Sequence, residues 1–433
     1  MATQSPGGTS GSPSPTRTRY WVIVFAVTLA LVTYIHRVCI SLAAPVISAD
    51  LKLSKFEMGW VFSAFVVAYS AFEIPGGYLS DRYGPRRVLT WVVTWWSIFT
   101  AATGWAWGFL SLAVARFFFG AGQAAGFPNL TKAFTIWLPK TERTRAQGIM
   151  WMSARWGGAL APGLAYLAIQ AVGWRVTFAL FGALGVIWAA IFWAWYRDNP
   201  RENKSANAAE LALLDGAERH AAGHGDVPWG KMLRSRHVWL LCLQYFCLGY
   251  GWYFYITWLP TYLKEARGLE LGKSALFSGL PLFFGGIGSI FCGFALSRVA
   301  QRIGSIAKAR RLMACIGFSG ATVMLLVASQ LKDPLAAMLA MGLASFSNDL
   351  AMPPSWGAAM DIGGKYAGTL SGAMNMVGNF GGIISPPSIG YILQVTGNWQ
   401  LTFTISSAVY FAGVFCWLFL DPVTPFDRSA EAH

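Results

Sequence analysis

The sequence predicts an all-α membrane protein whose twelve transmembrane helices form two six-helix bundles with pseudo-twofold symmetry. Composition is the first observation: 55% of the 433 residues are hydrophobic and only 12% are charged, about half the charged fraction of a soluble domain. The second is that apolar runs of about 20 residues, the length that crosses a bilayer, recur along the chain. The third is a central polar segment that separates six such runs from six more, as in transporters built from internal repeats.

The apolar runs define each predicted element in order. A Gly-, Ser-, Pro- and Thr-rich cytoplasmic tail, 1–19, is expected to be disordered, and a second tail covers 421–433. The N-terminal bundle covers 20–196, a cytoplasmic linker covers 197–235, and the C-terminal bundle covers 236–420. The individual spans are expected at 20–45, 56–80, 87–106, 108–131, 146–171, 174–196, 236–262, 274–297, 309–331, 334–357, 367–395 and 399–420.

Basic residues predict the orientation of the chain. With the N-terminus inside, the cytoplasmic segments hold roughly three times as many Lys and Arg residues as the external loops, which is the positive-inside bias. Both termini are therefore expected in the cytoplasm, and the protein in the plasma (inner) membrane. The same bias accounts for the net charge of +14 without a nucleic-acid partner. No nucleotide loop, metal-ligand set or catalytic triad appears, so no enzymatic activity, cofactor or metal is expected.

One motif lies between the second and third spans, GYLSDRYGPRR at 77–87. It resembles the G-x-L-x-D-R-x-G-x-R-R loop of the major facilitator superfamily, and a degraded copy, GFALSR at 293–298, stands at the matching place in the second half. Glycines allow close helix approach, and an acid can pair with a cation or a helix N-terminus across the seam. The predicted cytoplasmic gate consists of Gly77, Asp81, Arg82, Gly84, Arg86 and Arg87.

Charges inside the predicted spans mark a second set of residues. Arg37, Arg116 and Arg155 stand against two acids, Glu73 and Asp349, and such residues in a membrane indicate a functional site by default. An excess of arginine attracts an anion, and a guanidinium binds a carboxylate in a bidentate manner. The alternatives are that Arg37 and Arg116 are paired permanently with acids of the protein, and that Arg155 only snorkels to the membrane surface.

Several segments sharpen the resemblance to one branch of the superfamily. The chain from residue 20 onward is similar to the anion:cation symporter family, which includes bacterial hexuronate and aldonate carriers, with sialin and the vesicular glutamate carriers as distant relatives. This resemblance implies the major facilitator fold and transport of small organic anions by alternating access. The segments that carry it are YIHR at 34–37, EIPGG at 73–77, RFFFGAGQAAGFP at 116–128, SND at 347–349 and KYAGTLSGAMNMVGNFGG at 365–382.

The resemblance also implies a binding site. Arg37 and Arg116 match the two arginines that hold the substrate carboxylate in the family, and Tyr34 and Tyr69 match tyrosines that line the cavity. Asn375 and Asn379, one helical turn apart, are candidates to bind a polyol chain, although packing between helices is an equal alternative. Ser355 and Gln123, which lies two turns after Arg116, complete the predicted substrate-binding set.

The sequence departs from the family where a proton would bind. The usual acid before the first arginine is His36 here, and the usual glutamate after the second is Gln123, whereas Glu73 replaces a glutamine. The candidates for proton coupling are therefore Glu73, His36, whose imidazole titrates near pH 6.5 when unperturbed, and Asp349. The resulting prediction is a monomeric, proton-coupled symporter of sugar acids. The alternatives are a uniporter or exchanger of an aromatic or simple monocarboxylate, and a sensor that does not transport.

Overall fold

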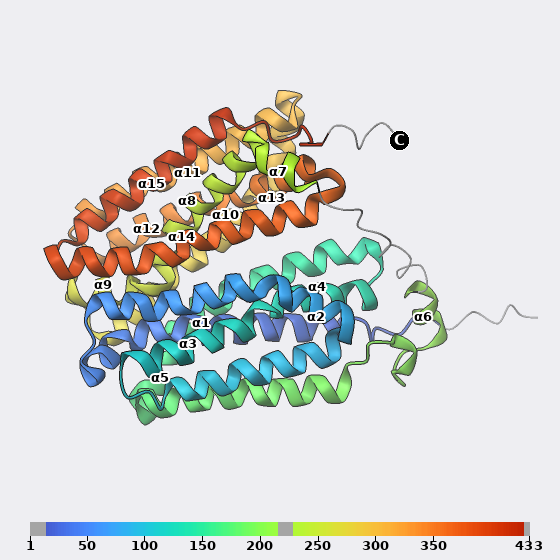
Figure 1. Ribbon diagram of the computed structural model, residues 1–433, viewed down its shortest axis with the longest axis horizontal. Helices are drawn as coiled ribbons and strands as arrows, with labels where there is room; N and C mark the ends of the chain where they lie inside the picture. The colour runs from blue at the N-terminus through green and yellow to red at the C-terminus, as the bar shows by residue number, and fades with distance from the viewer. Residues whose placement is uncertain (1–13, 215–227, 428–433) are drawn as a thin grey trace, which may run out of the picture.

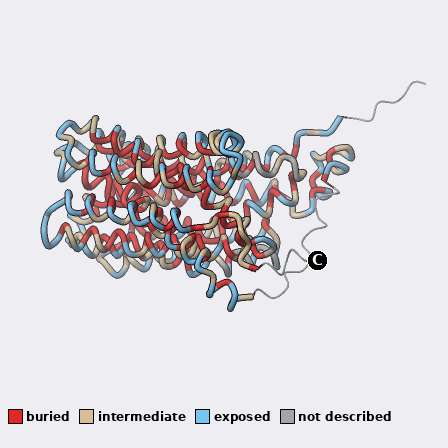
Figure 2. Tube along the Cα trace, turned by 90° about the horizontal axis from the view of Figure 1, so that it is seen from above, coloured by how far each residue is buried: buried red, intermediate tan, exposed pale blue. Residues whose placement is uncertain are grey.

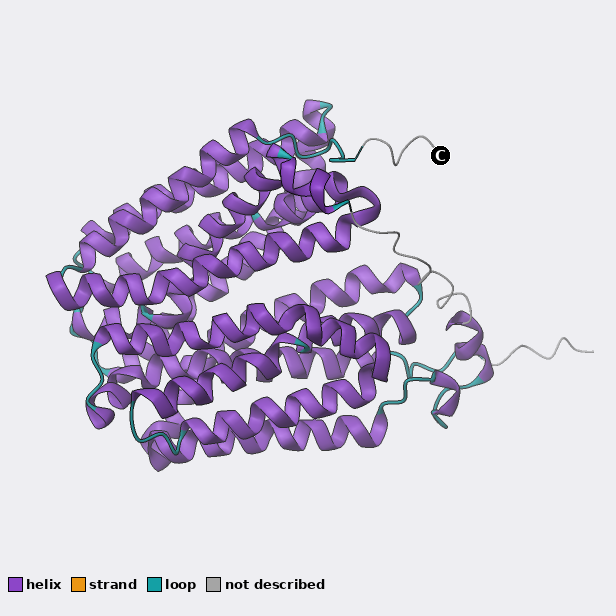
Figure 3. Cartoon of the chain, in the orientation of Figure 1, coloured by secondary structure: helices purple, strands orange, loops and turns teal. Residues whose placement is uncertain are grey.

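The computed structural model describes residues 14–214 and 228–427, and every regular element within these ranges is a helix (Figure 3). The N-terminal half contains α1 (Tyr20–Leu51), α2 (Lys55–Thr103), α3 (Phe109–Ala124), α4 (Gly126–Trp137) and α5 (Lys140–Trp195). The linker contains a 3-10 turn (Pro200–Glu202), α6 (Ala208–Leu214) and α7 (Trp229–Arg234). The C-terminal half contains α8 (Arg236–Thr257), α9 (Leu259–Glu265), α10 (Leu271–Ile303), α11 (Ile306–Gln330), α12 (Pro334–Leu350), α13 (Met352–Gly363), a 3-10 turn (Gly364–Tyr366), α14 (Ala367–Thr396) and α15 (Trp399–Phe419).

The twelve predicted spans all lie on these helices, which confirms the predicted fold class. Among the described residues, seven helical stretches are long and apolar enough to cross a membrane by length and composition alone, and the remaining spans lie on α2, α8 and α14. Both α2 and α5 carry two spans that meet at a glycine, Gly84 with φ 79° and Gly173 with φ 76°. Glycine adopts such positive φ values without the steric penalty that other residues pay.

The helices form two bundles that lie side by side, α1–α5 in one and α8–α15 in the other (Figure 1). The ends of the bundles near α9 are closer together than the ends near α6 and α7 (Figure 1). Both bundles contain buried residues, and exposed residues lie mainly on the outside of the molecule (Figure 2). Many exposed side chains are large and apolar, such as Trp91, Ile98 and Leu110, which a membrane protein presents to lipid.

Small residues bring the two halves together at the α9 end. The contacts join α2 to α14 and α5 to α10. A Cβ at Gly59 would lie 2.7 Å from the carbonyl oxygen of Pro386, and a Cβ at Gly279 would lie 2.5 Å from that of Ala159, so only glycine allows these backbones to approach so closely. Polar contacts add to them, because Ser63 Oγ donates to the carbonyl of Ile383 at 2.8 Å.

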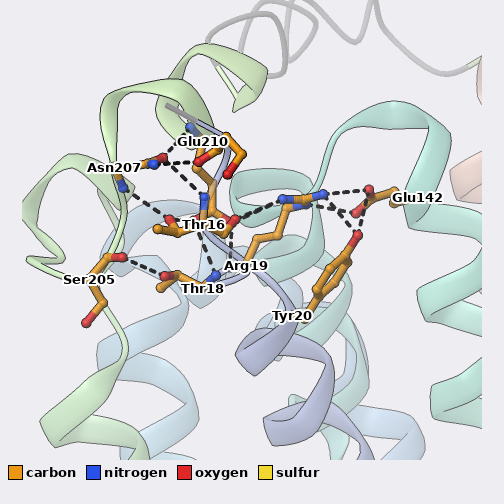
Figure 4. Close-up of polar contacts among 9 residues, drawn as sticks. Thr16, Thr18, Arg19, Tyr20, Glu142, Ser205, Asn207 and Glu210 are labelled. Carbon is orange, nitrogen blue, oxygen red and sulfur yellow. Dashed lines mark hydrogen bonds and ion pairs between the residues drawn. The ribbon is translucent and has the colours of Figure 1, made fainter. Parts of the chain in front are cut away.

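The linker helix α6 is attached to the N-terminal bundle by a polar network (Figure 4). Glu210, which is fully buried, accepts hydrogen bonds from the backbone N–H groups of Thr18 and Arg19 at 3.2 and 3.0 Å and from the Arg19 guanidinium at 3.2 Å. The same guanidinium bonds both carboxylate oxygens of Glu142 at 3.1 Å. The prediction of a disordered tail up to Arg19 is therefore too long at its end, while residues 1–13 lie outside the described residues.

Candidate functional site

Arg37 forms the centre of an aromatic cluster at the interface between the halves. Its guanidinium carbon lies 5.0 Å from the ring centre of Tyr34 and 4.9 Å from those of Phe65 and Tyr69. Because residues three or four apart share a helix face, α1 presents Tyr34 with Arg37 and α2 presents Phe65 with Tyr69. Arg37 Nε donates to Gln123 Oε1 at 3.2 Å, so four predicted site residues come together, with Phe65 as a member that the sequence did not indicate.

Arg116 reaches the same cluster from α3. Its side chain is buried, 2% exposed, and its guanidinium carbon lies 4.1 Å from the ring centre of Phe119 and 5.5 Å from that of Phe65. Arg116 Nε and Nη1 and Arg37 Nη2 have no hydrogen-bond partner among the described residues. Neither arginine forms an ion pair within the described part of the chain. Buried donors without a partner are costly, so this positive charge favours an anion.

Glu73 and Asn375 join the two halves near this cluster. The Asn375 amide, on α14, donates to both carboxylate oxygens of Glu73, on α2, at 2.8 and 3.0 Å. Glu73 also lies within electrostatic range of Arg37. Asn379, one turn beyond Asn375, is 9% exposed, and its amide nitrogen has no partner among the described residues.

A second contact across the halves joins Arg155 on α5 to Asp349 on α12. Arg155 Nη2 lies 3.1 Å from both carboxylate oxygens of Asp349, whose Oδ1 also accepts from Asn348 at 3.0 Å. The Arg155 guanidinium carbon lies 3.8 Å from the ring centre of Trp252. Snorkelling, the alternative weighed for Arg155, therefore does not describe it: the side chain is directed into the interface between the halves.

Two predicted site residues lie elsewhere. His36 is fully buried inside the N-terminal bundle, where its ring stacks on Phe181 at 6.3 Å and neither ring nitrogen has a partner among the described residues. Ser355 is fully buried inside the C-terminal bundle, where it donates to Gln244 at 3.1 Å. Trp417 donates to the same amide oxygen, so Ser355 belongs to the packing of α8, α13 and α15.

The predicted gate is organised around an acid that the sequence did not single out. Asp198 follows α5, and its Oδ1 accepts the backbone N–H of Arg86 at 2.9 Å. The Arg86 guanidinium donates to the carbonyl of Trp193 at 3.2 and 2.9 Å. A Cβ on Gly84 would lie 2.5 Å from Asp198 Oδ2. Burial raises the pKa of the Asp198 carboxyl, and the Arg86 N–H offsets part of that rise. In the sequence, the signal that could have indicated Asp198 is an acidic residue directly after the predicted span 174–196.

Among the other predicted gate residues, the structure describes the side chains of two arginines. Arg82 and Arg87 are exposed, whereas the side chains of Gly77 and Asp81 lie outside the described residues. The C-terminal half has a related arrangement, since Gly304 also has positive φ, 70°, and Arg311 donates to the carbonyl of Leu420 at 2.8 Å. Across residues 14–214 and 228–427, no group of three or more metal-ligating side chains is found.

Proteins of known family and name are similar to this chain over most of its length. The family described as Major Facilitator Superfamily matches residues 26–386. A Cupriavidus necator protein named "Probable sulfoacetate transporter SauU" is 36% identical, over 96% of this chain and 96% of that protein. The Escherichia coli protein named "Probable galactarate/D-glucarate transporter GudP" is 30% identical over 89% of each. The Bacillus subtilis hexuronate transporter is 28% identical over 95% of this chain and 97% of that one.

Solved structures agree on the fold. A bacterial homologue of the human lysosomal transporter Spinster, crystallised in an inward-facing and unoccupied conformation, superimposes with a TM-score of 0.72 at 17% identity, over 94% of this chain and 96% of that one. Its occupied, inward-facing form gives a TM-score of 0.74 at 18% identity, over 94% and 95%. At this identity the likeness concerns the fold alone.

Proposed function

The chain belongs to the major facilitator superfamily, and on this premise we propose that it is a secondary transporter of small organic anions that works by alternating access. It is an integral membrane protein and not an enzyme. The proposed orientation, with both termini in the cytoplasm, rests on the distribution of Lys and Arg. The proposed location is the inner membrane, and the proposed assembly is a monomer.

One observation carries the proposal: Arg37 and Arg116 converge on Phe65 without an acidic partner among the described residues. Gln123 accepts a hydrogen bond from Arg37 Nε but is neutral, so it contributes no negative charge to the guanidinium. Charge-assisted, bidentate bonds to a carboxylate or sulfonate would satisfy the free N–H groups. Tyr34 and Tyr69 then form the aromatic wall of the anion site.

We propose that sugar acids are the substrates, because relatives named for hexuronate and glucarate transport cover nearly the whole chain. The amides of Asn375 and Asn379 lie one turn apart on α14 and suit a polyol chain by hydrogen bonding. A short sulfonated carboxylate is the second candidate, since a relative at 36% identity is named for sulfoacetate transport.

Proton coupling belongs to the same proposal. The two acids predicted inside the spans, Glu73 and Asp349, each contact the opposite half, through Asn375 and Arg155. Protonation at either site would alter a contact that must change when the halves move. His36 contacts only its own bundle in the described structure, so we assign coupling to Glu73 first and to Asp349 second.

Counterflow in proteoliposomes tests the proposed function. The purified protein is loaded with unlabelled D-glucuronate, D-gluconate, D-glucarate or sulfoacetate, and entry of the same labelled anion is measured. We expect saturable counterflow of at least one anion, its loss in Arg116→Ala, and its retention in Arg302→Ala, an exposed arginine at the end of α10. Counterflow that is equal in Arg116→Ala and the unmodified protein would refute the assignment of the site.

A further inference from the structure

The Arg155 guanidinium is bound along one edge only. Nη2 contacts Asp349, whereas Nε and Nη1 make no hydrogen bond to any described residue. The side chain of Arg155 is 13% exposed, and Trp252, on which the guanidinium stacks, is also partly exposed. A guanidinium carries five N–H donors, so the edge away from Asp349 remains available to a ligand at the interface between the halves.

Helix α10 leaves room for this ion pair. A Cβ at Gly285 would lie 2.9 Å from Asp349 Oδ2 and 2.8 Å from Ser345 Oγ, and a Cβ at Gly286 would lie 3.5 Å from the Cβ of Arg155. Two adjacent glycines therefore let α10 pass directly beside the pair. Asp349 and Trp252 together hold the guanidinium plane in one orientation. A guanidinium that is already oriented loses little conformational entropy when it binds an anion.

The Arg155 site borders the Arg37 cluster through Tyr34. The Tyr34 ring packs on Arg37, and a Cβ at Gly158 would lie 3.2 Å from Cδ1 of the same ring. Gly158 and Arg155 are three residues apart on α5 and so share a face of that helix. The Tyr245 hydroxyl lies within electrostatic range of Tyr34 and Arg155. Arg37 and Arg155, both partly exposed, are thus connected through the Tyr34 ring.

We propose that Arg155 binds the second anionic group of a dianionic substrate whose first group is held by Arg37 and Arg116. This inference rests on the proposed function and narrows its substrates to anions with an acid at each end, such as sugar diacids or sulfonated carboxylates. Asp349 is the positioning residue, because it orients Arg155 without contacting the ligand. The competing explanation is that Arg155 and Asp349 only hold the two halves together.

Paired probes that differ in one acidic group separate these explanations. D-glucarate and D-gluconate share a six-carbon polyol chain, and sulfoacetate and glycolate form a second, short pair. Equilibrium binding is measured by calorimetry on the purified, full-length protein and on Arg155→Gln. Since Arg155→Gln leaves Asp349 buried without its cation, the neutral double variant Arg155→Gln/Asp349→Asn is measured beside it. Arg302→Gln is the matched control, and melting temperatures report folding.

We expect both Arg155 variants to weaken binding of the diacids about 10- to 100-fold, the loss of one charge-assisted pair, and binding of the monoacids less than about threefold. Arg155→Lys should recover little of the affinity for the diacids, because a lysine cannot form two parallel hydrogen bonds to an acidic group. Equal losses for diacid and monoacid would overturn the inference in favour of a structural latch, as would unchanged binding of both. An unmodified protein that binds none of the four probes would overturn the inference and the proposed function together.

Discussion

The amide of Asn375 donates to both carboxylate oxygens of Glu73, at 2.8 and 3.0 Å, and so connects α14 of one half to α2 of the other. An intramembrane acid whose partner belongs to the opposite bundle changes its surroundings whenever the bundles move. A group of this kind suits the uptake of a proton in one state and its release in the other. The prediction for Glu73 follows from that placement.

Glu73→Gln is expected to abolish pH-driven accumulation of substrate while exchange at zero gradient survives. Glutamine keeps the size of the side chain and an acceptor for Asn375, but it cannot titrate. Both rates are measured in proteoliposomes, with Glu270→Gln, an exposed acid before α10, as the control. Unchanged accumulation by Glu73→Gln would remove this residue from coupling.

Replacement of the two arginines proposed to bind the anion is expected to abolish uptake without unfolding the protein. Arg37→Ala and Arg116→Ala each remove one half of the proposed two-arginine clamp, and a loss of about 100-fold or more in uptake rate is expected. Arg→Lys at either position should recover little of it. Uptake is compared with the melting temperature, because a matching loss of folded protein would point to a structural role instead.

The gate is expected to control movement more than binding. Asp81→Asn should slow transport while equilibrium affinity for the substrate stays within about threefold, since the motif lies between the second and third spans, away from the Arg37 cluster. Transport rate and affinity are measured on the same preparation. An affinity loss as large as the rate loss would assign Asp81 to binding.

Gly84→Ala is expected to destabilise the protein more than Gly173→Ala. Both glycines have positive φ, 79° and 76°, with ψ of 153° and 163°, a region that costs other residues about 1–3 kcal/mol. A Cβ at Gly84 additionally meets Asp198, whereas a Cβ at Gly173 meets no atom within 4 Å. Thermal unfolding in detergent measures the difference, and equal melting temperatures would contradict the role of Asp198.

The contribution of Asp198 to folding stability depends on pH, because the pKa of its carboxyl is raised in the folded protein. Because the folded state holds the proton more tightly, this group favours folding at low pH, and its contribution falls as pH rises from the ordinary carboxyl value to the raised one. Asp198→Asn, which keeps an acceptor for the Arg86 N–H, should melt at or above the wild-type temperature at pH 7, and the difference should shrink near pH 4. Asp198→Ala should melt lower at both pH values. A lower melting temperature for Asp198→Asn at pH 7 would contradict this sign.

Local sequence patterns were sufficient to predict the helices, but they did not predict which side chains of different helices contact each other. Apolar runs placed all twelve spans, because crossing a bilayer depends on the composition of about 20 consecutive residues. The pairing of Arg155 with Asp349 depends instead on how α5 and α12, far apart in the chain, are placed against each other. His36 shows the same limit, since its neighbour Arg37 points to the interface while His36 packs on Phe181 within its own bundle. The family resemblance, in contrast, indicated Tyr34, Arg37, Tyr69 and Gln123 together, and the structure brings these four side chains into contact around one guanidinium.

The attachment of α6 to the N-terminal bundle determines how much of the linker can extend between the two halves. With Glu210 holding Thr18 and Arg19, the chain that runs between the halves starts at Leu214 and ends at Trp229, and its extended reach is about 50 Å. Ser205, whose carbonyl accepts from Thr18 Oγ1 at 2.7 Å, and Asn207, whose backbone N–H donates to Thr16 Oγ1 at 3.2 Å, hold the same part of the chain to the bundle. The linker up to α6 therefore belongs mechanically to the N-terminal bundle, and the largest separation of the two bundles is limited by the residues between Leu214 and Trp229 rather than by the whole linker.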